Sequence, residues 1–299
     1  MRTFKSQAAF SLIELVIVIV ITGILATSVA TIITRPIQGF IDLSRRATLV
    51  YSAESALRRM QRDIRRALPN SIRVAGGGTA IEVINTIEGA RYRAAPLPGD
   101  PDIDRYLQFN TTDSSFDILG NFSAATLANP NINHVAINNI GSVDAGGAAV
   151  AGANAYGDVD AISGTNVITP AGYAITLDGA PANEDNITIN DGGGGGFRFT
   201  YQSDNKRVYL VDTAISYVCS GNQLIRYTDY AFTNNPTQDV PPVGGTSALL
   251  ADSIGNCNFS YDAGSPSRSG LMTLDLSVTD AATGETVRLL HQVHVDNTP

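Results

Sequence analysis

The chain has 299 residues, of which 43% are hydrophobic and 16% charged, and its formal net charge is −8. This length allows one large domain or two smaller ones, and the balance of apolar and charged residues excludes a wholly disordered chain. Two cysteines and three histidines exclude a disulfide-framework miniprotein and a cysteine-rich zinc or iron–sulfur site.

The charges are unevenly distributed along the chain. Residues 1–73 hold eleven basic residues against four acidic ones, a net charge of +7, whereas residues 74–299 hold nine against twenty-four, a net charge of −15. We therefore expect a basic stalk joined to an acidic body.

A long uncharged apolar run opens the stalk. It extends from Leu15 to Ile33, 19 residues, and a helix of that length nearly spans the hydrocarbon core of a bilayer. Arg2 and Lys5 precede the run and a long polar region follows it. This arrangement predicts a single inner-membrane span with the N-terminus in the cytoplasm and the body in the periplasm.

A cleavable secretory signal is the alternative for this segment, because small residues at 26–30 could form a cleavage site. Glu14 argues against that interpretation. A carboxylate inside the membrane costs on the order of 3 kcal/mol and is rarely present without a partner, and a segment destined for removal would not need one.

An amphipathic stretch follows Pro36. Apolar residues recur there at steps of three and four, which predicts that one helix extends from about Phe10 to Leu68, with a kink near Pro36 and a stop at Pro69. Several arginines lie mostly off the apolar face. We interpret them as a solvated helix face rather than a nucleic-acid site, because aromatic residues are scarce nearby and the acidic body would repel phosphate.

The body changes from helical to strand periodicity at about Thr79. Alternating apolar and polar residues, separated by turn sequences, predict antiparallel strands and hairpins. The expected fold class is α+β, a long N-terminal helix packed on a mostly antiparallel β-sheet domain. The predicted strands lie near 81–88, 197–201, 208–219, 224–228, 257–261, 272–278 and 286–295.

Residues from about 120 to 196 are rich in Gly, Ala, Asn and Asp, which predicts long loops and short strands.

The run from Gly192 to Gly196 lacks the Lys and Ser/Thr of a phosphate loop. Oxygen ligands for calcium could come from Asn183, Asp185, Asn186, Asn190 and Asp191, but turn chemistry is the preferred interpretation. His291 and His294 would point to opposite faces of a strand. The sequence predicts no catalytic set, cofactor or metal site.

Two cysteines, Cys219 and Cys257, would lie outside the membrane in this topology. An oxidising compartment favours a disulfide between them, and two buried free thiols remain the alternative.

The segment from Ala9 to Leu15, read Ala-Phe-Ser-Leu-Ile-Glu-Leu after a short basic leader, resembles the signal of type IV pilins and type II secretion pseudopilins. The resemblance implies that a prepilin peptidase cuts after Ala9, where the family usually has Gly, and that Phe10 becomes an N-methylated N-terminus. It further implies that the Phe10 amine of one subunit neutralises Glu14 of a neighbour. Pairing within one chain is the alternative.

Four further segments resemble minor pilins of the mannose-sensitive haemagglutinin (MSHA) pilus: residues 65–71, 88–93, 211–219 and 289–299. The resemblance implies a non-enzymatic assembly role in a priming or tip complex. Partners would be other minor and major pilins, the prepilin peptidase and the inner-membrane assembly platform, without nucleic acid. A J-like minor pseudopilin of type II secretion and a tip adhesin that binds a surface through its loops are the alternatives.

The same resemblance divides the chain into a leader (1–9), the transmembrane half of the helix (10–36), its amphipathic half (37–70) and a β-rich periplasmic or extracellular domain (71–299).

Overall fold

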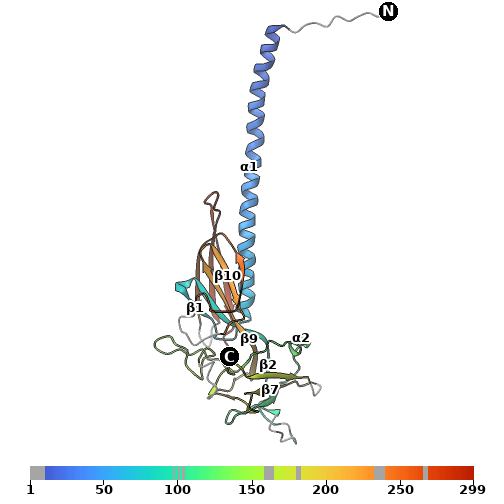
Figure 1. Cartoon of the computed structure of the whole chain (residues 1–299), viewed down its shortest axis with the longest axis vertical. Helices are drawn as coiled ribbons and strands as arrows, with labels where there is room; N and C mark the ends of the chain where they lie inside the picture. Colours follow the sequence, from blue (N-terminus) through green and yellow to red (C-terminus); the bar gives the residue numbers. More distant parts are fainter. Residues whose placement is uncertain are drawn as a thin grey trace, which may run out of the picture. The chain divides into compact units, whose positions relative to one another are not determined.

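A computed structural model of the chain describes residues 11–96, 98–99, 102, 105–157, 165–179, 183–231, 240–264 and 269–299, without the side chains of residues 30, 31, 34 and 35. The described chain is α+β, with an N-terminal apolar helix followed by an antiparallel β-domain, as the sequence predicts (Figure 1). By internal contacts it divides into two compact units, residues 1–50 and residues 51–299.

The N-terminal helix, α1, runs from Leu12 to Arg65 and continues through Pro36 without interruption. Pro36 therefore does not end the helix, and the kink expected near it stays a prediction. Proline removes one backbone donor, and the remaining helical hydrogen bonds on either side hold the helix together.

α1 ends three residues earlier than the sequence predicts, because the following strand captures the chain. The carbonyl of Arg66 accepts hydrogen bonds from Thr86, at 3.1 Å from its N–H and 2.6 Å from its hydroxyl, and Leu68 N–H donates to the Ile84 carbonyl at 2.8 Å. The Arg66 carbonyl is thus satisfied by β-structure, while the carbonyls of Asp63 and Ile64 accept from the N–H groups of Arg66 and Ala67 at 3.1 and 3.2 Å. Pro69 does not act as the stop.

The secondary structure after α1 comprises one short 3-10 helix, one short α-helix and fourteen strands within the described residues. In chain order they are β1 (Arg73–Ala75), η1 (Gly76–Gly78), β2 (Ala80–Arg91), β3 (Ser115–Asp117), α2 (Ala124–Leu127), β4 (His134–Ala136), β5 (Thr165–Asn166), β6 (Ala174–Asp178), β7 (Asn186–Asn190), β8 (Arg198–Phe199), β9 (Arg207–Ser220), β10 (Gln223–Thr228), β11 (Thr246–Ala251), β12 (Ile254–Asp262), β13 (Gly270–Thr279) and β14 (Thr286–Val295).

The strands form several sheets rather than one. The largest has the order β1-β2-β9-β10-β11, with β4 also paired to β9, and its long central pair β2 and β9 is antiparallel. A second sheet has the order β12-β13-β14, a third the order β3-β7-β6, and β5 and β8 form a short parallel pair. Figure 1 shows β3, β6 and β7 gathered at one end of the β-domain.

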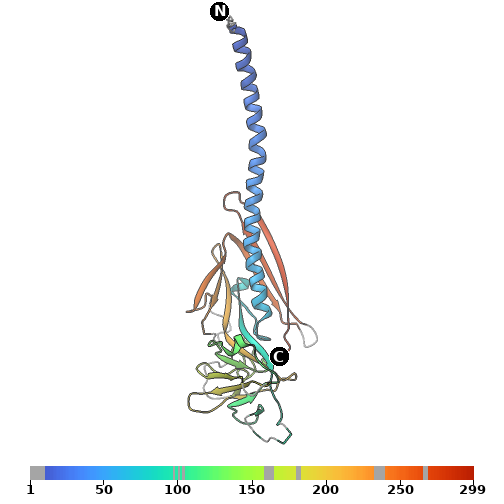
Figure 2. The same ribbon diagram turned by 90° about the vertical axis from the view of Figure 1, so that its right-hand side faces the viewer.

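The last turns of α1 lie beside the six-stranded sheet and the β12-β13-β14 sheet (Figure 2) and form side-chain hydrogen bonds to β9 and β14. Leu57, Met60 and Ile64 are fully buried on this part of the helix, in agreement with the predicted apolar face. Gln61 Nε2 lies 2.8 Å from His291 Nδ1 on β14. Burial of each such side chain contributes about 2 kcal/mol, so the helix end is an integral part of the domain core.

The middle of the chain holds the short strands that its composition predicts, together with a core that the composition did not reveal. Phe116, Ile187 and Phe199 are buried with other apolar side chains in a separate cluster, and Phe197 packs edge-on against Phe199 at 5.0 Å between ring centroids. The loops rich in Gly, Ala and Asn therefore connect short strands whose apolar side chains pack in this cluster.

Candidate functional site

The N-terminal helix begins with a side-chain cap. Ser11 Oγ accepts a hydrogen bond from the backbone N–H of Glu14 at 3.3 Å, and the Ser11 carbonyl accepts from Leu15 N–H at 3.1 Å. Since Leu12 is the first helical residue, Glu14 occupies the third position, which gives the Ser-x-x-Glu spacing of a capping box near the positive end of the helix dipole. Sequence reasoning missed this role, although the spacing itself was legible.

An apolar surface surrounds the first part of α1. The window Leu12–Val29 is long and apolar enough to cross a membrane. Its large hydrophobic side chains are between 49% and 82% exposed. A helix that is apolar all round is stable only in an apolar environment, so this segment requires a membrane or neighbouring helices.

The hydroxyl side chains in this window are satisfied within the helix. The hydroxyl of Thr22 donates to the Val18 carbonyl at 2.7 Å, and those of Thr27 and Ser28 donate to the Ile24 carbonyl at 2.9 and 3.0 Å. In hydrocarbon, where no water is available, such internal bonds remove the cost of the hydroxyl groups. The window is therefore compatible with a bilayer despite its three hydroxyl residues.

The two predicted processing residues lie outside the described chain. Ala9 and Phe10 fall outside it, so the cut after Ala9 and the pairing of the Phe10 amine with Glu14 stay predictions. The side chain of Glu14 is exposed on the first turn of α1. Within the described residues the structure gives it no ion-pair partner, which leaves its carboxylate available to a group from outside.

Several arginines near the end of α1, and Arg66 just after it, are engaged by neighbouring groups. Arg58 pairs with Glu54 at 2.6 Å, Arg59 with Asp63 at 3.4 Å, and Arg66 Nη2 donates to the Thr86 carbonyl at 3.2 Å. The side chains of Arg58 and Arg59 are 65% and 46% exposed, in agreement with the interpretation of a solvated helix face.

Cys219 and Cys257 are brought to disulfide distance. Cys219 lies on β9 and Cys257 on β12, 38 residues later, with 6.4 Å between their Cα atoms, within the usual range for a disulfide. The pair connects the six-stranded sheet to the β12-β13-β14 sheet.

Of the acidic and amide side chains considered for calcium, Asp185 is used by the protein itself. Asp185 is fully buried and accepts from the Phe122 N–H at 2.6 Å and from Asn121 Nδ2 at 2.7 Å. His291 is inward-facing and His294 exposed on β14, as the strand period predicts. In the described part of the chain, no group of three or more His, Cys, Asp or Glu residues is arranged to hold a metal ion.

Comparison with known families bears on the N-terminal segment. The model of the prokaryotic N-terminal methylation motif matches residues 4–30. Comparison with curated proteins and with solved structures gives no match. The motif is a type IV pilin-type prepilin signal.

The match covers Ala9, Phe10, the capped start of α1 and its exposed apolar window. The chain is thus similar over its N-terminal segment to type IV pilins and pseudopilins, which are structural proteins. The motif implies processing by a prepilin peptidase and assembly with other pilins, and the single apolar helix fits a membrane-anchored pilin.

Proposed function

We propose that the protein is a minor pilin-like subunit that acts in the assembly of an MSHA-type type IV pilus, in its priming or tip complex. The observation that carries the proposal is the methylation motif at residues 4–30, placed on a helix whose apolar side chains are exposed. Such a helix is retained after processing and holds the subunit in the membrane until it packs against the helices of other subunits.

The size of the body supports a position at an end of the filament. About 230 residues follow residue 70, and a domain of that bulk is more easily accommodated at a tip than along a tightly packed shaft. The chain segments at 65–71, 88–93, 211–219 and 289–299 resemble the MSHA pilus biogenesis protein MshO, which favours the same system.

The proposed assembly step uses the charge at Glu14. Hydrolysis of the peptide bond after Ala9 by a prepilin peptidase creates an amine at Phe10, which is then methylated and stays cationic. The amine of one subunit pairs with Glu14 of its neighbour, so two charges that are costly in the membrane become one pair in low dielectric. The helix then enters the filament through the inner-membrane assembly platform, with the body in the periplasm or on the cell surface.

The same motif serves pseudopilins, so a J-like minor pseudopilin of type II secretion is the second candidate function. The two differ in what the cell loses without the protein. Loss of the minor pilin removes surface pili, whereas loss of the pseudopilin removes secretion of folded proteins.

A clean deletion strain tests the proposal. We expect it to lack surface pili by electron microscopy, to secrete normally, and to regain pili when the full chain is expressed. Mass spectrometry of the complementing protein should find a methylated N-terminus at Phe10. Normal pili with lost secretion would favour the pseudopilin, normal pili with lost attachment would favour a tip adhesin, and a mature protein beginning near residue 30 would contradict all three.

A further inference from the structure

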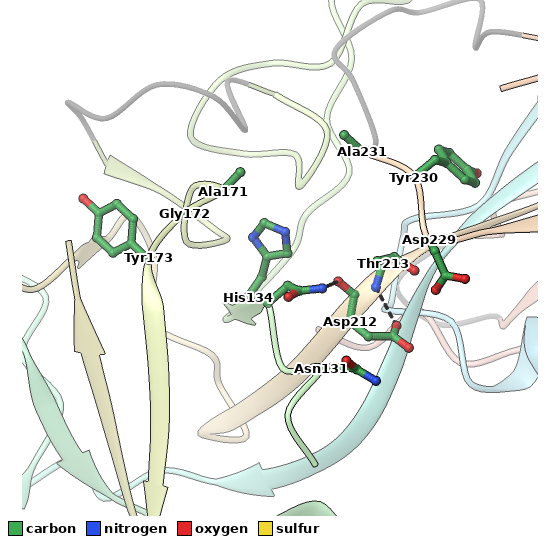
Figure 3. Close-up of a pocket in the computed structure, with 11 residues that line it drawn as sticks. Asn131, His134, Ala171, Gly172, Tyr173, Asp212, Thr213, Asp229, Tyr230 and Ala231 are labelled. Carbon is green, nitrogen blue, oxygen red and sulfur yellow. Dashed lines mark hydrogen bonds between the residues drawn. The ribbon is translucent and has the colours of Figure 1, made fainter. Parts of the chain in front are cut away.

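A cavity of about 690 Å³ lies in the β-domain, and neither cysteine is among its described lining residues (Figure 3). It is bounded by the chain leading into β4, the turn at Ala171 and Gly172 before β6, the middle of β9, and the segment that follows β10. Its volume is within the range of small-molecule binding sites in proteins. Neither the methylation motif nor the assembly role uses it.

The lining of this cavity is mostly polar. It includes the amides of Asn131 and Asn133, the carboxylates of Asp212 and Asp229, and the imidazole of His134. Among its described lining residues there is no lysine or arginine. The site therefore offers many hydrogen-bonding groups, and its two carboxylates disfavour phosphates, carboxylates and acidic sugars in contact with them.

The polar groups are held in place by neighbours behind them. Asp212 accepts from Asn85 Nδ2 at 2.8 and 2.9 Å and from Thr213 N–H at 2.6 Å, and its backbone carbonyl accepts from Asn133 Nδ2 at 2.8 Å. His134 is buried, and its Nδ1 donates to the Thr169 carbonyl at 2.7 Å, because a carbonyl oxygen can only accept. Side chains fixed in this way lose little conformational freedom when a ligand binds.

The two carboxylates are already compensated by neutral donors and, as a weaker effect, by the charges of Arg66 and Arg226. Asp212 accepts hydrogen bonds from Asn85 and Thr213. It is also partly buried, and this desolvation raises its pKa. Asp229 Oδ2 accepts from the hydroxyls of Thr228 and Thr246 at 3.0 and 2.6 Å. A carboxylate that already has hydrogen-bond partners contributes less free energy to the binding of an ammonium ion than a carboxylate without partners does. This difference favours an uncharged ligand.

Two aromatic rings border the same space. Tyr173 packs edge-on against Phe197 at 5.9 Å between ring centroids, which fixes its ring. The hydroxyl of Tyr230 bonds to Glu82 at 2.8 Å and to Ser216 at 2.6 Å, so its polar tip is engaged in the core. In the view of Figure 3 the two rings stand on opposite sides of His134.

We propose that this cavity binds an uncharged saccharide unit. A sugar ring carries hydroxyls on its rim, which suit amide and carboxylate partners, and C–H groups on its faces, which suit aromatic rings. Fixed planar amides and acids beside tyrosine rings match that pattern. The inference is independent of the pilus assembly role and adds a ligand site to whichever assembly the protein joins.

The test uses the full chain in lipid nanodiscs, so that no sugar-headed detergent competes. We expect retention of neutral oligosaccharides on a glycan array and saturation-transfer NMR signals from one of them. Ala171→Trp, which fills the cavity, should abolish both. Asn131→Ala, which removes an exposed amide, should weaken binding about fivefold, as loss of one neutral hydrogen bond predicts. Ala282→Trp, on the exposed turn between β13 and β14, should bind as the wild type does.

Three results would overturn the proposal. They are the absence of any bound neutral glycan, binding that survives Ala171→Trp, and binding restricted to acidic glycans or to the amines lysine and spermidine. The unfolding temperature of each variant is measured alongside. If Ala171→Trp fails to fold, the comparison of Asn131→Ala with Ala282→Trp decides, and equal affinities would reject the site.

Discussion

Asp63 Oδ2 accepts a hydrogen bond from the hydroxyl of Tyr217 at 2.6 Å. The same oxygen lies 2.9 Å from Nε of Arg226. Asp63 is on the last turns of α1, whereas its two partners lie on β9 and β10, so one buried carboxylate joins the helix to two neighbouring strands. Burial, with the negative charge of Asp63 as the second cause, raises the pKa of Tyr217, which keeps its hydroxyl a donor at neutral pH.

Replacement of Asp63 by alanine should strongly destabilise the domain. The change leaves the guanidinium of Arg226 and the hydroxyl of Tyr217 largely buried without their acceptor, and we expect the free energy of unfolding to fall by about 3 kcal/mol. Tyr217→Phe, which removes one bond only, should cost about 1 kcal/mol. Denaturant unfolding of the full chain in detergent micelles measures both.

Asp42→Ala is the matched control. Asp42 is on the same helix but its side chain is 61% exposed and lies 4.0 Å from Arg45, so its removal should change the free energy of unfolding by less than about 0.5 kcal/mol. Equal effects of Asp42→Ala and Asp63→Ala would show that the buried junction does not stabilise the domain.

This junction also shows what the sequence could and could not reveal. The helical period identified the apolar face that buries Leu57, Met60 and Ile64, because periodicity depends only on neighbours along the chain. The partners of Asp63 are more than 150 residues away in sequence, at separations of 154 and 163. Which strand residues meet a helix depends on sheet order and register, which local patterns do not encode.

The middle of the chain illustrates the same limit. Composition predicted loops and short strands between residues 120 and 196, and β4 to β7 are indeed short. The buried cluster around Phe116 and Phe199 draws its members from both sides of that region, so no single window displays it. The cavity lined by His134 and Asp212 was missed for the same reason, since its residues come from four separate segments.

The cysteine pair is expected to be oxidised in the native protein. Exchange of both Cys219 and Cys257 for serine should lower the free energy of unfolding by about 4 kcal/mol, because the bond would close a loop of 38 residues in the unfolded chain. Mass spectrometry after alkylation without reduction should find no modified cysteine. Two alkylated cysteines in the protein purified from membranes would refute the bond.

Glu14→Ala should separate membrane anchoring from assembly. The apolar window remains and gains hydrophobicity, so the chain should still fractionate with the membrane. Without the carboxylate, the amine of a neighbouring subunit has no counter-charge, and we expect the variant to be absent from sheared pili. Glu54→Ala, which removes an exposed acid paired with Arg58 farther along the helix, should assemble normally. Recovery of Glu14→Ala in pili at wild-type levels would remove the proposed role.

Alkaline pH should destabilise the β-domain through its buried tyrosines. Burial raises the pKa of Tyr92 from 10.0 to about 12, and it raises the pKa of Tyr156 and Tyr230 as well. In the unfolded chain these phenols ionise near pH 10, so the unfolded state releases protons first and stability falls as the pH rises above that value. The phenolate absorbance and the near-ultraviolet circular dichroism should therefore change together. Full tyrosine ionisation at pH 10 with native dichroism would contradict the burial.

Asp212 and Asp275 should respond to pH in opposite directions. Desolvation by burial raises the pKa of Asp212, so its ionised form opposes folding and this cost disappears below the ordinary carboxyl pKa. Two hydrogen bonds from Arg288, at 2.8 and 2.6 Å, lower the pKa of Asp275, so its ionised form stabilises the fold until the pH falls through the lowered pKa. Asp212→Asn should accordingly raise the unfolding temperature relative to wild type, and by more at neutral pH than at acidic pH. Asp275→Asn should lower the unfolding temperature, again by more at neutral pH than at acidic pH. Thermal unfolding of both variants at the two pH values measures the differences, and shifts of the same sign would contradict the assigned environments.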